Sequence, residues 1–448
     1  MREPTEIQVE EHTPIIERVA AIDVAKASGT VCTRLPHDTI DGKRVTKVWE
    51  VEATTSALLE LADHLACQGV ERVVLESTSE YWRPFFYLLE ARGLTVWLVN
   101  ANQVKHAPGR PKSDKIDAVW LAKLNERSML SASFVPPVEI RRIRDWARTR
   151  FDLVSDRTRV KQRIEKLLED ALIKLSIVAT DIFGVSGRAM MEALISGQRS
   201  PKALAELAKA RMRSKRAELE KALEGRFTDH HAQLLRLLLD QLDQLEGSIA
   251  RATATLEELV ADLPAARPPQ GTATTGLHTT AEYLSAVERL DEIPGIDTGI
   301  AHTLIAELGL DMSVFGTARR LAAWAKVAPL TKQSGKRRGR GKTGKGNPYL
   351  KSALGQAATS AAKTDTRLGE RYRRLVKRMP KSKAKTALAR TILTIVFELL
   401  SDPTARYQDL GTDFYTRQID TRRRTDHLVR QLQALGHKVT LTPADQAA

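Results

Sequence analysis

Four acidic residues in the first third of the chain stand where a metal ion would need oxygen ligands. Asp23 interrupts the apolar run VAAIDVAK, and Glu76 ends the apolar run VVLE. Asp114 and Asp117 are three residues apart in KSDKIDAVWLAKL, so they share one face near the start of the helix that this segment predicts. Clustered carboxylates repel one another unless a cation lies between them. Two Mg²⁺ ions held by such oxygens can activate and orient the oxygens of a phosphodiester.

Each acid also has a simpler explanation. Asp114 could be a helix N-terminal residue that the helix dipole favours, and Asp117 could be a solvated helix charge. An aspartate inside an apolar strand, as predicted for Asp23, is harder to explain in this way. Glu80 could replace Glu76, but it lies beyond the predicted strand and ranks below it. The histidines form no metal-binding pattern such as HExxH.

A second candidate for chemistry is the stretch KQSGKRRGRGKTGKGN, Lys332 to Asn347. A nucleotide-binding P-loop would need a glycine at position 336 to match Gly341-Lys342-Thr343, but that residue is Lys336. The preceding LAAWAKVAPLTKQ predicts a helix and a proline-broken connection, not the buried strand that a P-loop follows. The pattern therefore does not indicate an NTPase.

The same stretch predicts a flexible cationic loop that contacts a nucleic-acid backbone. Its expected contacts are Lys332, Lys336, Arg337, Arg338, Arg340, Lys342 and Lys345. Ser334 is followed by Gly335, and a serine hydroxyl attacks a phosphodiester only where its neighbours assist deprotonation or stabilise the phosphorane. The flanking lysines and arginines could do both. On the residues alone, a solvated serine in a DNA-binding loop remains the simpler interpretation.

The charge distribution favours a polyanionic partner. The chain has 70 Lys and Arg against 55 Asp and Glu, a net charge of +15. From Met312 to Thr364 there is no acidic residue, but there are twelve lysines and arginines. A field of one sign over this length is unfavourable by self-repulsion unless a polyanion lies against it, and phosphates that bind there release counterions.

The elements that must position the acids follow from hydrophobic periodicity. Residues 17–130 predict three consecutive strands and then helix, strand, helix, strand and helix, which is the order of the ribonuclease H fold. In that α/β topology the first strand, the fourth strand and the last helix converge. The four carboxylates are then expected at one metal site.

The rest of the chain is expected to be mainly helical. Residues 138–262 contain two long segments with leucines at coiled-coil spacing, although a plain helical bundle would fit too; either offers a surface for self-association. Residues 263–280 are rich in proline, glycine and threonine and predict a linker. In residues 281–448, the segment LDEIPGIDTGIAHTLIAELG predicts a helix-hairpin-helix-like motif. Its Gly295 and Gly299 could direct backbone N–H groups at a DNA phosphate, or the segment could be an ordinary Pro-Gly helix turn.

Nothing in the sequence indicates a membrane protein. The longest apolar run, from about Thr391 to Leu400, is interrupted by Glu398 and is shorter than a span of about 18 residues. The N-terminal MREPTEIQVEEH is acidic and unlike a secretory signal. The two cysteines, Cys32 and Cys67, predict neither a metal site nor a disulfide framework. A cytoplasmic protein is expected.

Together these segments resemble the transposases of the insertion-sequence one-ten family, which are relatives of the Piv DNA invertases. The resemblance covers nearly the whole chain in the family's order. It rests on AIDVAKAS, on the stretch from VVLESTSEYW to KSDKIDAVWLAKL, on SDRTRVKQRIEKLLEDALIKLS, on IPGIDTGIAHTLIAELG, and on VAPLTKQSGKRRGRGKTGKGNPYLKSAL.

The resemblance implies a RuvC-like domain with an Asp-Glu-Asp-Asp site for Mg²⁺ and a C-terminal domain with a nucleophilic serine. The acids map onto Asp23, Glu76, Asp114 and Asp117, and the serine maps onto Ser334. One departure is ESTSEYW, where relatives usually have a smaller, less polar stretch after the glutamate. It leaves the choice between Glu76 and Glu80 open.

The resemblance also implies a reaction. A bacterial, DNA-associated recombinase would excise and insert its own element, with a structured noncoding bridge RNA pairing to double-stranded donor and target DNA. The serine would form a covalent phosphoserine, and the metal site of another subunit would complete the active site. Holding two duplexes implies a dimer of dimers bridged by the helical arms.

Two other hypotheses remain from the residues. One is a metal-dependent nuclease or Holliday-junction resolvase that uses only the four carboxylates. The other is a non-catalytic nucleic-acid-binding scaffold, which would have no reason to keep an aspartate inside an apolar strand.

Overall fold

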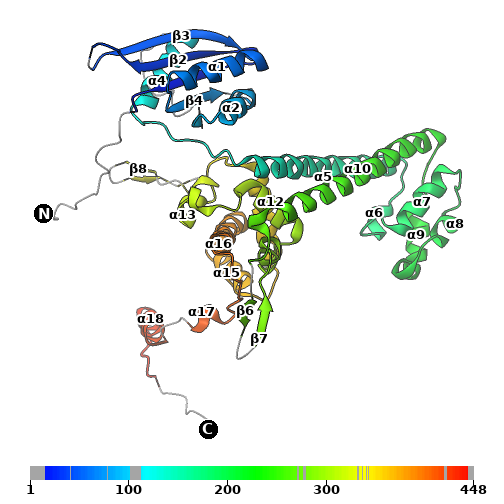
Figure 1. Ribbon diagram of the computed structural model, residues 1–448. Helices are drawn as coiled ribbons and strands as arrows, with labels where there is room; N and C mark the ends of the chain where they lie inside the picture. The colour runs from blue at the N-terminus through cyan, green and yellow to red at the C-terminus, as the bar shows by residue number, and fades with distance from the viewer. Residues whose placement is uncertain are drawn as a thin grey trace. The chain divides into compact units, whose positions relative to one another are not determined.

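The computed structural model divides the chain into two compact units, Met1–Val135 and Pro136–Ala448 (Figure 1). The N-terminal unit is α/β and the C-terminal unit is almost entirely helical. The described residues are 16–40, 42–77, 79–100, 113–269, 272–275, 279–329, 332–334, 337–339, 341, 343–417 and 421–441. The finer division at 138–262, 263–280 and 281–448 remains a prediction.

The N-terminal unit contains a five-stranded sheet in the order β3-β2-β1-β4-β5. The first three strands are antiparallel neighbours, whereas β4 pairs parallel with β1, and β5 parallel with β4. Parallel pairing requires a crossover, which α1 and α2 supply. The predicted element order of the ribonuclease H fold is confirmed. The strands are β1 (Val19–Val24), β2 (Ser28–Pro36), β3 (Arg44–Glu52), β4 (Arg72–Ser77) and β5 (Val96–Val99).

Helices cover both faces of this sheet, since its central strands are apolar on both sides. α1 (Thr55–Cys67) and α2 (Trp82–Ala91) pack on the face that includes Ile22 of β1. α4 (Asp114–Glu126) packs on the opposite face, which includes Ala21. Because side chains alternate along a strand, Asp23 belongs to the face of Ala21 and α4.

The C-terminal unit begins with a hairpin of two long helices, α5 (Val138–Asp170) and α10 (Asp229–Asp262). Three contacts show that they run antiparallel: Asp170 with His231 at 3.2 Å, Lys161 with Glu246 at 3.8 Å, and Arg150 with Thr253 at 2.7 Å. The buried residues of α10 recur mostly at intervals of three or four residues, which is the spacing typical of a coiled coil. The two predicted arms therefore pair within one chain, and a supercoil remains a prediction.

Short helices close the far end of this hairpin. Their apolar residues form one core with the C-terminal end of α5 and the N-terminal half of α10, and this core includes Ile164, Leu194 and Leu235. These helices are α6 (Leu175–Val178), α7 (Val185–Ile195), α8 (Pro201–Glu206), the 3₁₀ helix η1 (Ala210–Lys215) and α9 (Arg216–Ala222).

The remaining helices are α11 (Ala286–Asp291), α12 (Thr298–Leu308), α13 (Ala318–Trp324), α14 (Pro348–Ala361), α15 (Arg367–Val376), α16 (Lys381–Ser401), α17 (Phe414–Arg417) and α18 (Thr421–Ala434). The apolar helix α16, whose Leu388, Ile392 and Val396 are fully buried, packs against α11, α13, α14 and α15. Two small hairpins, β6–β7 (Thr272–Thr275, Thr279–Glu282) and β8–β9 (Lys332–Ser334, Arg337–Gly339), belong to the same unit.

The first of these hairpins lies largely in the segment predicted to be a linker. Among the described helices, including α16, none has the length and apolar character that a membrane span requires.

Candidate functional site

The sheet brings two of the four predicted ligands together. Asp23 in β1 and Glu76 in β4 are register partners across the parallel pair, where neighbouring strands lie about 4.8 Å apart. Both are partly buried, near the carboxyl ends of their strands. Both belong to the α4 face, as shown by Ala21 and Val74 two positions earlier, which pack in one cluster with α4.

α4 returns antiparallel to these strands, because its C-terminal end is fixed at their beginnings. Asn125 Nδ2 donates to the carbonyl oxygens of Ala20 (3.0 Å) and Arg72 (3.2 Å), and Arg72 Nε donates to Asn125 Oδ1 at 2.7 Å. Along the helix, Asp117 lies about 12 Å from Asn125, and along the strand, Asp23 lies about 10 Å from Ala20. The first turn of α4 is therefore level with the strand ends that hold Asp23 and Glu76.

Asp114 and Asp117 both lie in that first turn, as predicted. Ser113 caps the helix by accepting the N–H of Ile116 at 3.3 Å. Asp114 is exposed and Asp117 is partly buried. Within the described ranges, no three His, Cys, Asp or Glu side chains are gathered closely enough to hold a metal ion. The backbone places the first turn of α4 level with the strand ends of Asp23 and Glu76, and a Mg²⁺ site made by all four acids remains a prediction.

Glu80, the alternative to Glu76, lies outside the sheet. Its side chain is 71% exposed and pairs with Arg83 at 2.9 Å, at the start of α2. Glu76, in contrast, lies within β4. The position in the sheet favours Glu76 as the ligand.

Packing against α14 requires a glycine at position 295, in the turn between α11 and α12. Gly295 has φ +91°, and a Cβ there would lie 2.4 Å from the carbonyl oxygen of Ala357 in α14. Only glycine allows this approach. Gly299 lies in the first turn of α12, whose N-cap is Asp297. The predicted phosphate contacts of Gly295 and Gly299 remain a prediction, since the packing accounts for Gly295 without DNA.

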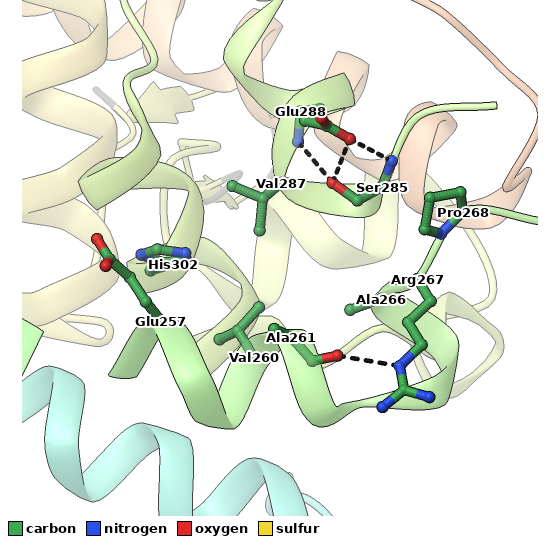
Figure 2. A pocket seen from close by; sticks show the side chains of 10 residues that line it. All are labelled: Glu257, Val260, Ala261, Ala266, Arg267, Pro268, Ser285, Val287, Glu288 and His302. Atoms are coloured by element: carbon green, nitrogen blue, oxygen red, sulfur yellow. Dashed lines mark hydrogen bonds between the residues drawn. The ribbon is translucent and has the colours of Figure 1, made fainter. Parts of the chain in front are cut away.

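A pocket of about 410 Å³ lies between the C-terminal end of α10, the start of α11 and α12 (Figure 2). Several of its polar groups bond to one another: Ser285 and Glu288 form a reciprocal helix cap, and Arg267 Nε donates to the carbonyl oxygen of Ala261 at 3.1 Å. His302 is buried in its wall, and burial lowers the pKa of its imidazole, although Glu257 opposes the shift. The burial of His302 agrees with a structural role for its side chain.

The predicted catalytic serine lies in a short hairpin. The register pairs Ser334 with Arg337, Gln333 with Arg338 and Lys332 with Gly339. The sequence indicated a flexible loop here, whereas the backbone of 332–334 and 337–339 forms two paired strands. Lys336, Arg340 and Lys342 lie outside the described residues, and Lys345 is exposed.

The C-terminal end of the basic stretch is held in place by α14. Asn347 caps this helix, with Oδ1 accepting the N–H groups of Tyr349 (3.0 Å) and Leu350 (3.2 Å). Lys351 Nζ donates to the carbonyl oxygens of residues 344 (3.0 Å) and 345 (3.1 Å). The stretch from Lys332 to Asn347 is therefore joined to α14 at its C-terminal end by hydrogen bonds.

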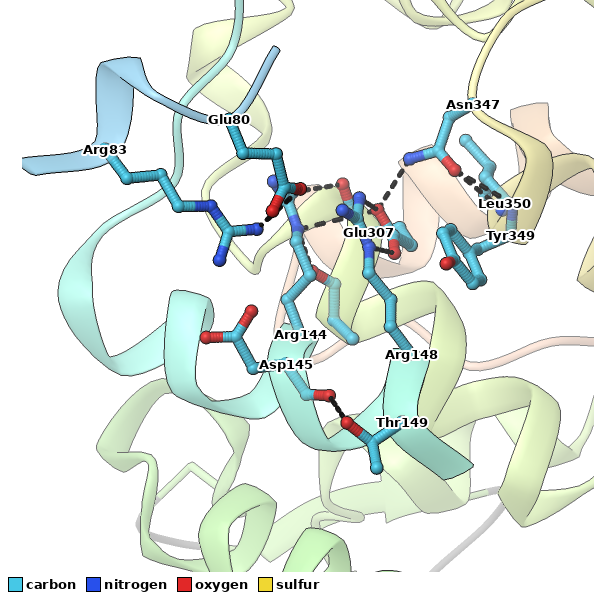
Figure 3. Close-up of polar contacts among 11 residues, drawn as sticks. Glu80, Arg83, Arg144, Asp145, Arg148, Thr149, Glu307, Asn347, Tyr349 and Leu350 are labelled. Atoms are coloured by element: carbon cyan, nitrogen blue, oxygen red, sulfur yellow. Dashed lines mark hydrogen bonds and ion pairs between the residues drawn. The ribbon is translucent and has the colours of Figure 1, made fainter. Parts of the chain in front are cut away.

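A buried carboxylate ties this helix cap to α5 (Figure 3). Glu307, in the last turn of α12, has no solvent exposure. Its two oxygens accept a fork of hydrogen bonds from Arg148 at 2.8 and 2.9 Å, and Asn347 Nδ2 donates to it at 2.5 Å. Arg144 lies 3.4 Å away and also donates to the carbonyl oxygens of residues 306 and 307. Glu307 was not predicted from the sequence, although an acid inside the apolar run TLIAELG is a visible signal.

The sheet order and the helices on both faces define the class: a ribonuclease H-like α/β domain joined to a helical unit. A family model described as Transposase, of the DEDD type of IS110, matches residues 20–173. A second, described as Transposase IS116/IS110/IS902 family, matches residues 287–373. Together they match more than half of the sequence, and the chain belongs to the IS110 transposase family, with a RuvC-like DEDD domain. The resemblance to the insertion-sequence one-ten family is confirmed.

Two similar solved structures are RuvC of Thermus thermophilus, alone and in complex with a Holliday junction substrate. Each is 14% identical and covers 26% of this chain and 99% of the RuvC chain, with TM-scores of 0.21 and 0.20. Scores this low carry no argument about function. Comparison with curated protein sequences gives no match.

Proposed function

We propose that this transposase excises and inserts its own insertion sequence by using a carboxylate metal site and a serine nucleophile. The observation that carries the proposal is the register pair of Asp23 and Glu76, level with the acidic first turn of α4. Like charges brought together at one edge are unfavourable unless a cation joins them.

The acids Asp23, Glu76, Asp114 and Asp117 would hold Mg²⁺, which supplies charge neutralisation at a phosphodiester. The protein's own contribution is orientation. β1 and β4 carry two of the carboxylates on adjacent strands. The hydrogen bonds of Asn125 fix the position of α4 along these strands, and with it the position of Asp114 and Asp117. Ser113, by capping α4, helps to hold its first turn in that place.

Ser334 would attack the phosphorus of the DNA backbone. The Ser Oγ–P bond forms as the bond from phosphorus to a sugar oxygen breaks, and the hydroxyl proton leaves to solvent while the sugar oxygen gains one. The backbone register supports this role by pairing Ser334 with Arg337, and Lys332 and Arg338 lie in the same hairpin. Cations at these positions would stabilise the charge that develops on the phosphorane.

The partners in this proposal are double-stranded donor and target DNA, together with a noncoding bridge RNA that selects both by base pairing. A dimer of dimers would hold the two duplexes. The acid-free stretch from Met312 to Thr364 supports polyanion binding. Changing the pairing segment of an RNA copied from the element's flank should redirect insertion; unchanged target choice would refute guidance by that RNA.

The serine is tested by trapping the covalent intermediate. Wild-type protein and Ser334→Ala are incubated with junction DNA and Mg²⁺, and adducts that resist SDS are counted on a gel. Ser334→Ala should give no adduct, whereas Ser352→Ala, a control serine in α14, should keep it. An adduct that persists in Ser334→Ala would show that another residue is the nucleophile.

The carboxylates are tested separately. Asp23→Asn should abolish cleavage of the DNA strand. The control Asp63→Asn should not, because Asp63 on α1 forms an exposed ion pair with Arg92. If Asp23→Asn removes cleavage while Ser334→Ala leaves it intact, the protein is a RuvC-like metal nuclease or resolvase. If neither change alters any cleavage, a nucleic-acid-binding scaffold is the remaining hypothesis.

A further inference from the structure

A second positively charged surface lies outside the segment that carries Ser334. From Arg371 to Phe397 the chain has nine lysines and arginines and no acidic residue. At the centre of this run, α15 ends and α16 begins, and four exposed cations lie within seven positions. This surface, the basic turn, comprises Lys377, Arg378, Lys381 and Lys383.

Three other cations of the run, Arg371, Arg373 and Arg374, have partners within the protein. Arg373 pairs with Glu370 at 3.0 Å and with Asp365 at 3.4 Å. Arg371 donates to the hydroxyl of Tyr415 at 3.3 Å, and Arg374 lies over the ring of Tyr415, 4.9 Å from its centre. In the part of the chain that the structure describes, none of the four basic-turn residues has a carboxylate at ion-pair distance.

The fold gives these cations no local stabilisation. Lys381 and Lys383 lie in the first turn of α16, which has no acidic residue, and the helix dipole disfavours cations at that end. Pro380 is the N-cap of α16, and only Lys377, Arg378 and Met379 separate it from the end of α15 at Val376. Four like charges so placed are unfavourable in the free protein and favourable against a polyanion.

We propose that the basic turn binds the phosphodiester backbone of a polynucleotide, in addition to the contacts of the hairpin that carries Ser334. The inference rests on the proposed function in taking the partner to be a polynucleotide. The turn lies beyond residue 373, where the second family match ends. Lysine contacts to phosphates carry no sequence information, so this surface contributes affinity and position, and not target choice.

The test compares two triple variants of the full chain. One is Lys377→Gln, Lys381→Gln and Lys383→Gln. The control is Lys202→Gln, Arg211→Gln and Arg213→Gln, which removes three exposed cations on α8 and η1. Binding to a random-sequence DNA duplex and to an RNA hairpin is measured as salt is raised, and thermal melting confirms that both variants fold.

Each lost phosphate contact lowers the slope of log affinity against log salt by about 0.9 for duplex DNA. Loss of three lowers it by about 2.7, so between roughly 50 and 200 mM salt the wild-type affinity should fall about 40-fold further than the variant's. A change with the duplex alone assigns the turn to DNA, and a change with the hairpin alone assigns it to RNA. An unchanged slope, or an equal change in the control, overturns the proposal.

The adduct assay keeps the two proposals apart. If the salt dependence of binding falls in the basic-turn variant but Ser334→Ala still forms an adduct, the proposed serine nucleophile is wrong and the proposed binding by the basic turn is supported. If the adduct depends on Ser334 but the slope is unchanged, only the basic turn fails.

Discussion

Replacing Glu307 should destabilise the C-terminal unit more than any surface change. The carboxylate is fully buried between Arg148, Arg144 and Asn347. Glu307→Ala removes the carboxylate that pairs with both arginines and, with it, the compensation that this carboxylate gives to their charge.

The magnitude follows from the geometry. Arg148 makes a two-pronged pair with Glu307, with both nitrogen–oxygen distances under 3.0 Å. Removing one partner of a buried pair costs about 3–5 kcal/mol, mainly because the other charge stays buried. Glu307→Gln should cost less than Glu307→Ala, because one oxygen still accepts from Arg148. For a unit of this size, the larger cost corresponds to a melting temperature lower by on the order of 10 °C.

Urea and thermal unfolding of the full chain measure this cost. The matched control is Asp156→Asn on α5, since Asp156 pairs with Arg159 at 2.9 Å where the side chains are 46% and 64% exposed. An exposed pair of this kind contributes about 0–1 kcal/mol, so the control should melt close to wild type.

A double substitution tests the cause. In Arg148→Met with Glu307→Leu, both charges are replaced by apolar groups, and the loss should be smaller than the sum of the single losses. If Glu307→Ala costs no more than Asp156→Asn, or if the double variant shows simple additivity, the buried network does not stabilise the unit and the reasoning is wrong.

Three further outcomes follow from particular residues. Since burial depresses the pKa of His302 below its ordinary 6.5, folding stability should fall as the pH drops through and below that value, and in His302→Leu urea titrations should show less of this dependence. Burial raises the pKa of Cys32 to about 11, so a thiol reagent at about pH 8 should label exposed Cys67 alone until the protein unfolds. Gly295→Ala should lower the unfolding free energy by about 2 kcal/mol or more, because φ is positive and Ala357 blocks the Cβ; an unchanged urea midpoint would contradict this.

The N-terminal fold could be predicted because its signals are local. The central strands β1 and β4 are short, mainly apolar runs, and α1 and α2 each have one apolar face. The order of these elements then determines which strand ends converge. The sequence therefore predicts that Asp23 and Glu76 are neighbours, as the register of β1 and β4 shows. The pairing of α5 with α10 inside one chain did not follow. A leucine-rich seam has the same pattern whether its partner lies in the same chain or in another.

The hairpin at Ser334 shows a different limit. Lysines, arginines and glycines have weak strand preference, so the composition indicated a loop. The backbone nonetheless pairs Ser334 with Arg337 across a two-residue connection. Backbone hydrogen bonds in so short a hairpin need no apolar face, and the hydrophobic pattern therefore does not report them.

Glu307 and Asp23 give the same signal in the sequence, an acid inside an apolar element, yet the structure gives them different neighbours. Glu307 is surrounded by donors, with Arg148 and Arg144 supplying positive charge from α5, so its charge is compensated inside the chain. Asp23 has another carboxylate, Glu76, as its register partner. An acid among cations stabilises a fold, whereas an acid beside an acid favours the binding of a cation. The sign of the neighbouring charge, which depends on residues more than 50 positions away in both cases, is what separates a structural carboxylate from a candidate metal ligand.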